Sequence, residues 1–246
     1  MRVLLPIPSA DFDPTEAAVP WKTLSEAGID VVVATPDGRS AKADSIVLEG
    51  TALGPLRFLL RADANGRRAY EEFANAACEA PQSYESINPE DFEALILPGG
   101  HAPKMRDYLE SKTLHAIISH FFAADKLVAA ICHGVVAAAR AKRPDGNSVL
   151  SGKRTTALTE NMEILAWKLT RRKLGDYYRT YPQTVQEEVT AALGENGVFL
   201  TGPKPFLRDT PKKPGRGFIV TDGNYISARY PGDVHRFSQA IVQALR

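Results

Sequence analysis

The 246-residue chain has few cysteines and almost no net charge, and each shortage excludes a class of protein. Its two cysteines, Cys78 and Cys132, are too few for a disulfide framework, so we expect a reducing compartment, the cytoplasm. Thirty basic and 29 acidic residues leave a net charge of +1, which gives no basic surface for nucleic acid or for an anionic membrane. We therefore expect neither nucleic acid nor a membrane among its partners.

Long apolar runs and cofactor motifs are also missing. No run approaches the roughly 20 residues that cross a bilayer, and Met1–Pro8 is too short and too broken by proline for a signal peptide. Neither G-x-x-x-x-G-K-[ST] nor G-x-G-x-x-G occurs, and no His, Cys, Asp or Glu cluster has metal-ligand spacing, so we expect no cofactor and no metal. Four histidines are interpreted as scattered surface or packing residues: His101, His115, His120 and His235.

What the sequence does contain is a strand–helix–strand pattern at its start. Hydrophobic residues make up 44% of the chain, enough for a full core. Apolar strands at Arg2–Pro8 and Ile29–Thr35 flank a helix at Thr15–Ala27, and such a unit predicts a parallel sheet. We predict a single α/β domain over residues 1–246, a mostly parallel, flavodoxin-like sheet with helices on both faces. Residues 39–91 are predicted to leave the sheet as an inserted cap over part of the site, with one helix at Arg68–Ala80.

Further elements follow the same alternation. Strands are predicted at Phe92–Pro98, Leu127–Cys132, Leu150–Leu158 and Val198–Thr201, with an antiparallel hairpin at Phe218–Ala228. Helices are predicted after the strand at 127–132 and at Ala102–Leu109, Lys112–Ala124, Thr159–Leu169, Thr184–Leu193 and Gly232–Leu245.

The apolar strand that ends on Cys132 turns directly into a run of helix-forming residues. Ala130, Cys132 and Gly134 have the small-x-nucleophile-x-Gly spacing of a nucleophile elbow, in which tight packing requires small neighbours. A helix that begins at His133 places partial positive charge and free N–H groups beside the sulfur, which favours the thiolate. The alternative is a buried structural cysteine.

Two more stretches stand at the carboxyl ends of predicted strands, where open α/β sheets bind ligands. Glu16 lies in the first turn of the helix after the first strand, where it could also merely complement the helix dipole. Gly99 and Gly100 follow a second strand, and the N–H of Gly100 could pair with that of His133 as an oxyanion site. An ordinary Gly-Gly turn is the alternative.

Four stretches together resemble the ThiJ/PfpI superfamily, which has the class I glutamine amidotransferase-like fold. They are Phe12–Glu16 with Ala34–Gly38, Leu97–His101, Ala130–Gly134 and Thr221–Ala228. Within the superfamily, the Asp-Pro-Thr-Glu stretch is most similar to the subgroup of heat-shock chaperones and cofactor-independent glyoxalase III enzymes. The resemblance covers nearly the whole chain and is weakest at residues 39–91 and 170–195.

The resemblance implies a role for each matching residue. Cys132 would be the nucleophile, His133 its base, and Glu16 the acid in contact with the sulfur, while the glycine pair and His133 would bind the oxyanion. The third member of the Cys-His-acid set would be Glu163 or Glu160, and Glu163 fits the spacing better. Because an ionised Glu16 would repel a thiolate, we expect its carboxyl to be at least partly protonated.

The subgroup implies a cofactor-independent enzyme that acts on small reactive carbonyls. Its reaction would be conversion of methylglyoxal to lactate or the related release of glycation adducts, and family habit implies a homodimer. A cysteine amidase or peptidase using the same residues is one alternative, and a stress-induced holding chaperone or redox sensor is another. Glutaminase activity is disfavoured because the chain lacks the downstream His-x-Glu pair of the amidotransferases.

Overall fold

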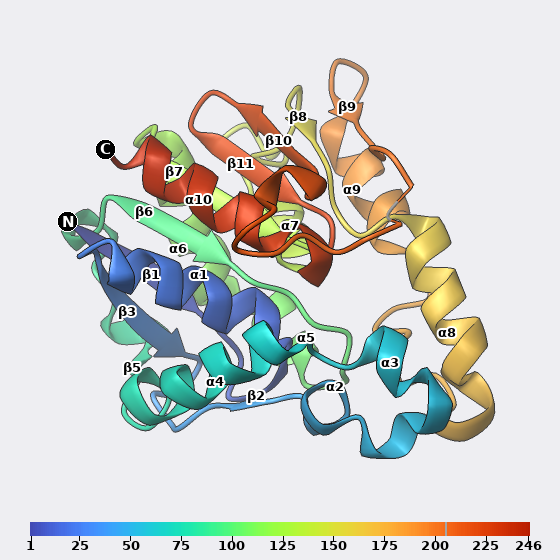
Figure 1. The fold of residues 1–246 in the computed structure, drawn as a ribbon. Helices are drawn as coiled ribbons and strands as arrows, with labels where there is room; N and C mark the ends of the chain where they lie inside the picture. Colours follow the sequence, from blue (N-terminus) through green and yellow to red (C-terminus); the bar gives the residue numbers. More distant parts are fainter. Residues whose placement is uncertain (205) are drawn as a thin grey trace.

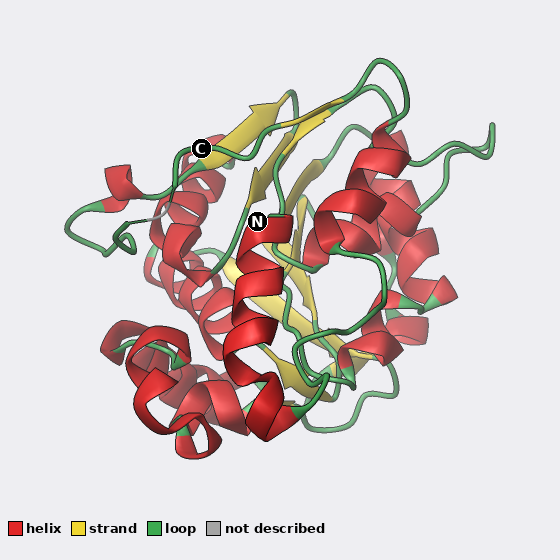
Figure 2. Ribbon diagram, turned by 90° about the vertical axis from the view of Figure 1, so that its right-hand side faces the viewer, coloured by secondary structure: helices red, strands yellow, loops and turns green. Residues whose placement is uncertain are grey.

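The computed structural model describes residues 1–204 and 206–246 and has a seven-stranded sheet at its centre. The strand order is β10-β11-β7-β6-β1-β3-β5, and every neighbouring pair is parallel except β10 and β11. Helices pack against both faces: α1, α4 and α10 on one side, and α5, α6 and α7 on the other (Figures 1 and 2). The predicted three-layer α/β fold, with its late antiparallel hairpin, is confirmed.

The elements have the following bounds. The strands of the sheet are β1 Arg2–Pro6, β3 Asp30–Thr35, β5 Gln82–Ser83, β6 Ala94–Leu97, β7 Leu127–Ile131, β10 Ile219–Asp222 and β11 Tyr225–Ala228. Two small ladders pair β2 Ala10–Phe12 with β4 Lys42–Ala43, and β8 Arg154–Thr155 with β9 Val198–Phe199. The α-helices are α1 Pro14–Glu26, α2 Ser45–Glu49, α3 Arg57–Leu60, α4 Ala64–Ala77, α5 Met105–Leu109, α6 Lys112–Ala123, α7 Gly134–Arg140, α8 Glu160–Leu174, α9 Val185–Leu193 and α10 Val234–Ala244. The short 3₁₀ helices are η1 Thr51–Leu56, η2 Tyr84–Ser86, η3 Pro89–Asp91, η4 Pro214–Arg216 and η5 Pro231–Asp233.

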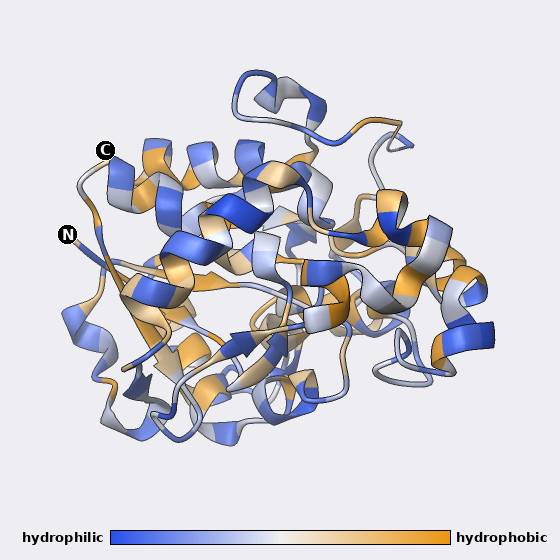
Figure 3. Ribbon diagram, turned by 60° about the horizontal axis from the view of Figure 1, so that its bottom comes forward, coloured by the Kyte–Doolittle hydropathy of each residue, from blue (hydrophilic) through white to orange (hydrophobic). Residues whose placement is uncertain are grey.

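The central strands are apolar because both of their faces are covered. Every residue of β6 and β7 is buried, as are four of the five in β1. The long strands in the left half of Figure 3 are accordingly coloured mainly as hydrophobic. The order β3-β1-β6-β7-β11 is the 2-1-3-4-5 order of flavodoxin-like sheets. Its switch point lies between β1 and β6, so ligands are expected beyond the carboxyl ends of these strands.

Only part of the predicted excursion at residues 39–91 leaves the sheet. The helix expected at Arg68–Ala80 is α4, which begins earlier because Asp63 caps it by accepting the N–H of Gly66. The segment 81–89, predicted to leave the sheet with the rest of residues 39–91, contains β5, which extends the sheet beside β3. Residues 45–60 form the short helices α2, η1 and α3, which lie near α8 (Figure 1). They share a small apolar cluster with Ala62 and Tyr178.

Several boundaries differ from the sequence prediction. The strand expected at Leu150–Leu158 is reduced to β8, and the helix expected to end near Leu169 continues as α8 to Leu174. In the described ranges 1–204 and 206–246, no helix has both the length and the apolarity to cross a bilayer.

Candidate active site

Cys132 stands at a strained turn between β7 and α7. Its φ of 57° lies in the left-handed region, which costs a non-glycine residue roughly 1–2 kcal/mol. The N–H of Cys132 donates to the carbonyl of Ala228 at 3.1 Å, which ties the turn to β11. A Cβ on Gly134 would lie only 2.0 Å from the carbonyl oxygen of Leu97, so α7 starts in contact with the end of β6. The local geometry is therefore that of the predicted elbow.

The His133 ring connects Cys132 to Thr180. Its Nδ1 lies 3.6 Å from the Cys132 sulfur and its Nε2 lies 3.3 Å from Thr180 Oγ1. The Thr180 hydroxyl donates its own proton to the carbonyl of His101 at 2.7 Å, so towards His133 it can only accept. Nε2 must then carry the ring proton, which leaves the lone pair of Nδ1 directed at the thiol. These contacts hold His133 in the tautomer that can act as a base towards Cys132.

Glu16 comes from the first turn of α1, whose N-cap is Asp13. Its Oε2 accepts the N–H of Gly99 at 2.9 Å, while its buried Oε1 has no hydrogen-bond partner in the described part of the chain. A Cβ on Gly99 would lie 2.8 Å from Glu16 Oε2, 3.0 Å from the Cys132 Cβ and 2.6 Å from the His133 N. The missing side chain of Gly99 therefore allows the carboxyl, the cysteine and an amide to converge on one point.

The N–H groups of Gly99 and Gly100 have different partners. The N–H of Gly99 is occupied by Glu16, whereas in residues 1–204 and 206–246 the N–H of Gly100 has no protein acceptor. The N–H of His133 interacts with the Cys132 sulfur. Of the two amides expected for an oxyanion site, that of Gly100 is thus available among the described residues and that of His133 is directed at the sulfur, whereas the amide of Gly99 orients the acid.

Burial favours the uncharged forms of Glu16, His133 and Cys132. Burial raises the pKa of Glu16 well above its usual value, and the neighbouring Asp13 carboxyl raises it further, as the expected protonated carboxyl requires. Burial also lowers the pKa of His133 well below its usual value. The pKa of Cys132 is raised by burial first and by Glu16 and Asp13 next, and the His133 N–H only partly opposes this shift. The resting thiolate expected from the helix start is therefore corrected to a thiol.

Glu163 does not contact His133, contrary to the expected third member of the set. Its Oε2 accepts the N–H of Val185 at 2.9 Å, and its Oε1 lies 3.7 Å from Arg179. Burial raises the pKa of this carboxyl to about 7. Glu160, the other candidate, lies at the exposed start of α8. Within the described residues, the hydroxyl of Thr180 occupies the place where a carboxylate was expected.

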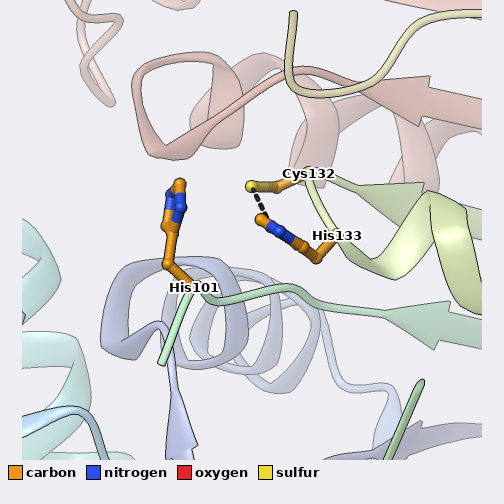
Figure 4. Close-up of side chains that lie close together, drawn as sticks. All are labelled: His101, Cys132 and His133. Atoms are coloured by element: carbon orange, nitrogen blue, oxygen red, sulfur yellow. Dashed lines mark hydrogen bonds between the residues drawn. The ribbon is translucent and has the colours of Figure 1, made fainter. Parts of the chain in front are cut away.

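His101 belongs to the site, although the sequence suggested only a scattered surface or packing residue. Its ring packs edge-on against that of His133, with centroids 4.9 Å apart, and its buried Nδ1 has no partner in the described residues (Figure 4). Burial lowers the pKa of His101 to about 4. Ligand atoms of His101, Cys132 and His133 lie within 4.8 Å of one another, so the fold brings together three residues that could hold a metal ion.

No sequence signal pointed to Thr180 as a partner of His133, since the two lie 47 positions apart. The segment 176–181 is aromatic and polar in sequence, with no pattern that singles out Thr180. Arg106 fixes this segment through two hydrogen bonds to the carbonyl of Thr180, at 3.0 and 2.6 Å. The placement of the hydroxyl thus depends on contacts between distant elements.

Comparison with known proteins identifies the family. The sequence matches the family described as ThiJ/PfpI family-like over residues 7–191, which is most of the chain. The chain belongs to this family. It is 27% identical, over the full length of both chains, to a protein of Pyrococcus abyssi named as a deglycase. It is 26% identical to a protein of Schizosaccharomyces pombe named as a glutathione-independent glyoxalase, over 87% of this chain and 81% of that one.

Solved structures agree on the fold. The crystal structure of glyoxalase III from Candida albicans superposes with a TM-score of 0.73 at 19% identity, covering 99% of this chain and 97% of that one. The rapid encystment protein of Francisella tularensis superposes equally well, with a TM-score of 0.73 at 18% identity. The resemblance noted from four sequence stretches is confirmed at the level of family and fold.

Proposed function

We propose that the protein is a cofactor-independent cysteine enzyme that converts reactive carbonyls, with methylglyoxal to lactate as its reference reaction. The observation that carries this proposal is the chain Cys132–His133–Thr180, with the protonated carboxyl of Glu16 against the same cysteine. Relatives that match the chain over most of its length and are named as deglycases and glutathione-independent glyoxalases support the same reaction class.

The first step forms a bond between the Cys132 sulfur and the aldehyde carbon. His133 Nδ1 accepts the thiol proton as the sulfur attacks, and the aldehyde oxygen becomes the hydroxyl of a hemithioacetal on taking up a proton from Glu16. The amides of Gly100 and His133 would stabilise negative charge on that oxygen as it develops. A neutral imidazole and a neutral carboxyl are the protonation states that these two roles require.

The second step moves a proton between adjacent carbons. Loss of the proton on the former aldehyde carbon gives an enediol, and reprotonation of the neighbouring carbon gives a lactoyl thioester, with Glu16 or His133 carrying the proton. Water then cleaves the thioester to lactate and the free thiol. The net reaction adds one water and needs no external oxidant or reductant.

The decisive experiment incubates the purified protein with methylglyoxal, without glutathione or added metal, and follows lactate. We expect lactate from the wild type and its loss in Cys132→Ala and Glu16→Gln. Cys78→Ala is the matched control, because Cys78 is buried at the end of α4, outside the site. No lactate from a folded wild type whose Cys132 is accessible to an alkylating reagent would refute the proposal.

A holding chaperone is the second candidate, favoured by large apolar side chains on the surface. Phe58 is 84% exposed and Phe206 is 88% exposed. The test is suppression of aggregation of a heat-denatured client protein by the Cys132→Ala variant. Suppression that survives in this variant and is lost in Phe58→Ser with Phe206→Ser would support chaperone activity independent of the cysteine.

We also propose that the protein is a homodimer in the cytoplasm and a single domain with its cap inside residues 39–91. The reducing compartment is supported by both cysteines being free and buried. Light scattering coupled to gel filtration tests the dimer, for which a mass near 27 kDa, that of one chain, would be the contrary result.

A further inference from the structure

An apolar cavity of about 280 Å³ adjoins the candidate active site. It shares Asp13 and His101 with the site, and Tyr178, which packs edge-on against the His101 ring at 5.2 Å, forms part of its wall. The rest of the wall is mainly aliphatic or aromatic. Its residues include Leu158, Met162, Leu165, Ala166, Leu169 and Phe206.

We propose that this cavity binds the apolar substituent of the substrate, so that the enzyme prefers 2-oxoaldehydes with an extended alkyl or aryl group to methylglyoxal. This inference rests on the proposed function, because it assumes that the aldehyde reacts at Cys132. It assigns binding to α8 and to Phe206, neither of which carries a catalytic group.

The size of the cavity argues for a group larger than methyl. An apolar cavity of about 150 Å³ in another protein is enough to hold benzene, a six-carbon ring. The cavity beside His101 is nearly twice that volume, and a single methyl group would leave most of it unfilled. A six-carbon substituent fits with room to spare.

The chemistry of the wall argues for an uncharged substituent. Among the described residues, the charged side chains that line the cavity are Asp13 and Arg208. Burial raises the pKa of Asp13 to about 6, and the charge of Arg208 only partly opposes this shift. All of the wall that α8 contributes is apolar, from Met162 to Leu169. Burying such an apolar surface against an apolar ligand is favourable because it removes both from water, whereas the surface has few hydrogen-bond partners for a charged or strongly polar group.

Exposure of the wall residues gives a second argument. Leu165 is 55% exposed and Leu169 is 38% exposed, although both lie on a helix with many charged positions facing the solvent. Packing of the protein core does not fully explain these leucines, since the described chain leaves more than a third of each one exposed. An apolar ligand in the cavity would remove part of their surface from water.

The test compares 2-oxooctanal with methylglyoxal, because the two share the same reacting group and differ by five methylenes. One methylene in a hydrophobic pocket is worth roughly 10- to 200-fold in specificity, so we expect kcat/KM for 2-oxooctanal to be at least 10-fold higher. Ala166→Phe fills the cavity and should reduce this preference at least 10-fold. Lys168→Phe is the matched control, since it adds the same ring at an exposed position of α8 outside the cavity and should leave the preference unchanged.

A second readout is independent of turnover. In a Cys78→Ala background, saturation kinetics of Cys132 alkylation are measured with iodoacetamide and with N-hexyl-iodoacetamide. Tighter binding of the hexyl reagent that is lost in Ala166→Phe and retained in Lys168→Phe supports the apolar subsite even if neither aldehyde is converted, in which case the proposed function alone fails. Equal binding of both reagents, or a preference for methylglyoxal that Ala166→Phe does not alter, would overturn the subsite.

Discussion

Replacing Thr180 by Val should impair the base without altering the shape of the site. Valine keeps the branched outline of threonine but cannot accept the Nε2–H of His133, which lies 3.3 Å from the hydroxyl. A buried donor left without a partner costs about 1–3 kcal/mol. The ring can avoid this cost by moving its proton to Nδ1, but Nδ1 then cannot accept the proton of Cys132. Whether the ring keeps its unpartnered proton on Nε2 or must first move it back from Nδ1, the transition state lies higher in free energy by about that cost. We therefore expect kcat to fall about 5- to 150-fold.

The assay is kcat for methylglyoxal, together with the pH dependence of Cys132 alkylation and the Tm. Thr180→Ser is the control, because it restores the hydroxyl and should recover most of the kcat and the wild-type pH profile. A purely structural role for Thr180 predicts instead that kcat follows Tm in both variants. The reasoning is refuted if Thr180→Val folds normally and turns over methylglyoxal within twofold of the wild-type rate.

Three further predictions concern packing and charge. Gly134→Ala should lower the free energy of unfolding, measured in urea, by about 3 kcal/mol or more, because the new Cβ would lie 2.0 Å from the Leu97 carbonyl oxygen. Gly215→Ala is the control and should be neutral, because its new Cβ would have nothing within 4 Å. The pKa of Glu163 is raised to about 7, whereas the unfolded chain loses this proton from about pH 4.5. Between these pH values the folded protein binds more protons, so the free energy of unfolding should fall as pH rises. Glu163→Gln should remove this pH dependence and so raise the free energy of unfolding relative to the wild type by up to about 3 kcal/mol at pH 8. Equal pH dependence of unfolding in the two proteins would contradict this prediction. Alkylation of Cys132 should still be accelerating at pH 9, and a rate plateau below pH 7 would indicate a resting thiolate after all.

The parts of the fold that the sequence predicted are those that depend on local pattern. The apolar run of β7, the small residues Ala130 and Gly134, and the glycines after β6 each carry their signal within a few positions, and the elbow followed from them. The edge strand β5 was missed because its two residues, Gln82 and Ser83, have no strand pattern of their own. Their conformation comes from pairing with β3.

The parts of the site that the sequence missed depend on contacts between distant segments. His101 adjoins a predicted motif, yet its edge-on contact with His133 exists only because β6 and β7 are neighbours. Thr180 reaches His133 from a segment between α8 and α9 that Arg106 holds in place. Glu163 had the right spacing along the chain, but its side chain turns to the start of α9.

Burial and the start of α7 have opposite effects on the charge of Cys132, and their magnitudes decide which one prevails. A helix N-terminus favours an anion by about 0.3–1 kcal/mol, and by about 2 kcal/mol in favourable partly buried sites. Full burial can shift a pKa by up to about 3–5 units, at roughly 1.4 kcal/mol for each unit. For Cys132 both effects act, and burial is the larger, so the sulfur is held as a thiol beside a neutral His133. The Cys132 thiolate then forms only as the sulfur attacks the substrate and His133 accepts its proton. The orientation of the His133 ring, which Thr180 fixes, should therefore control the rate.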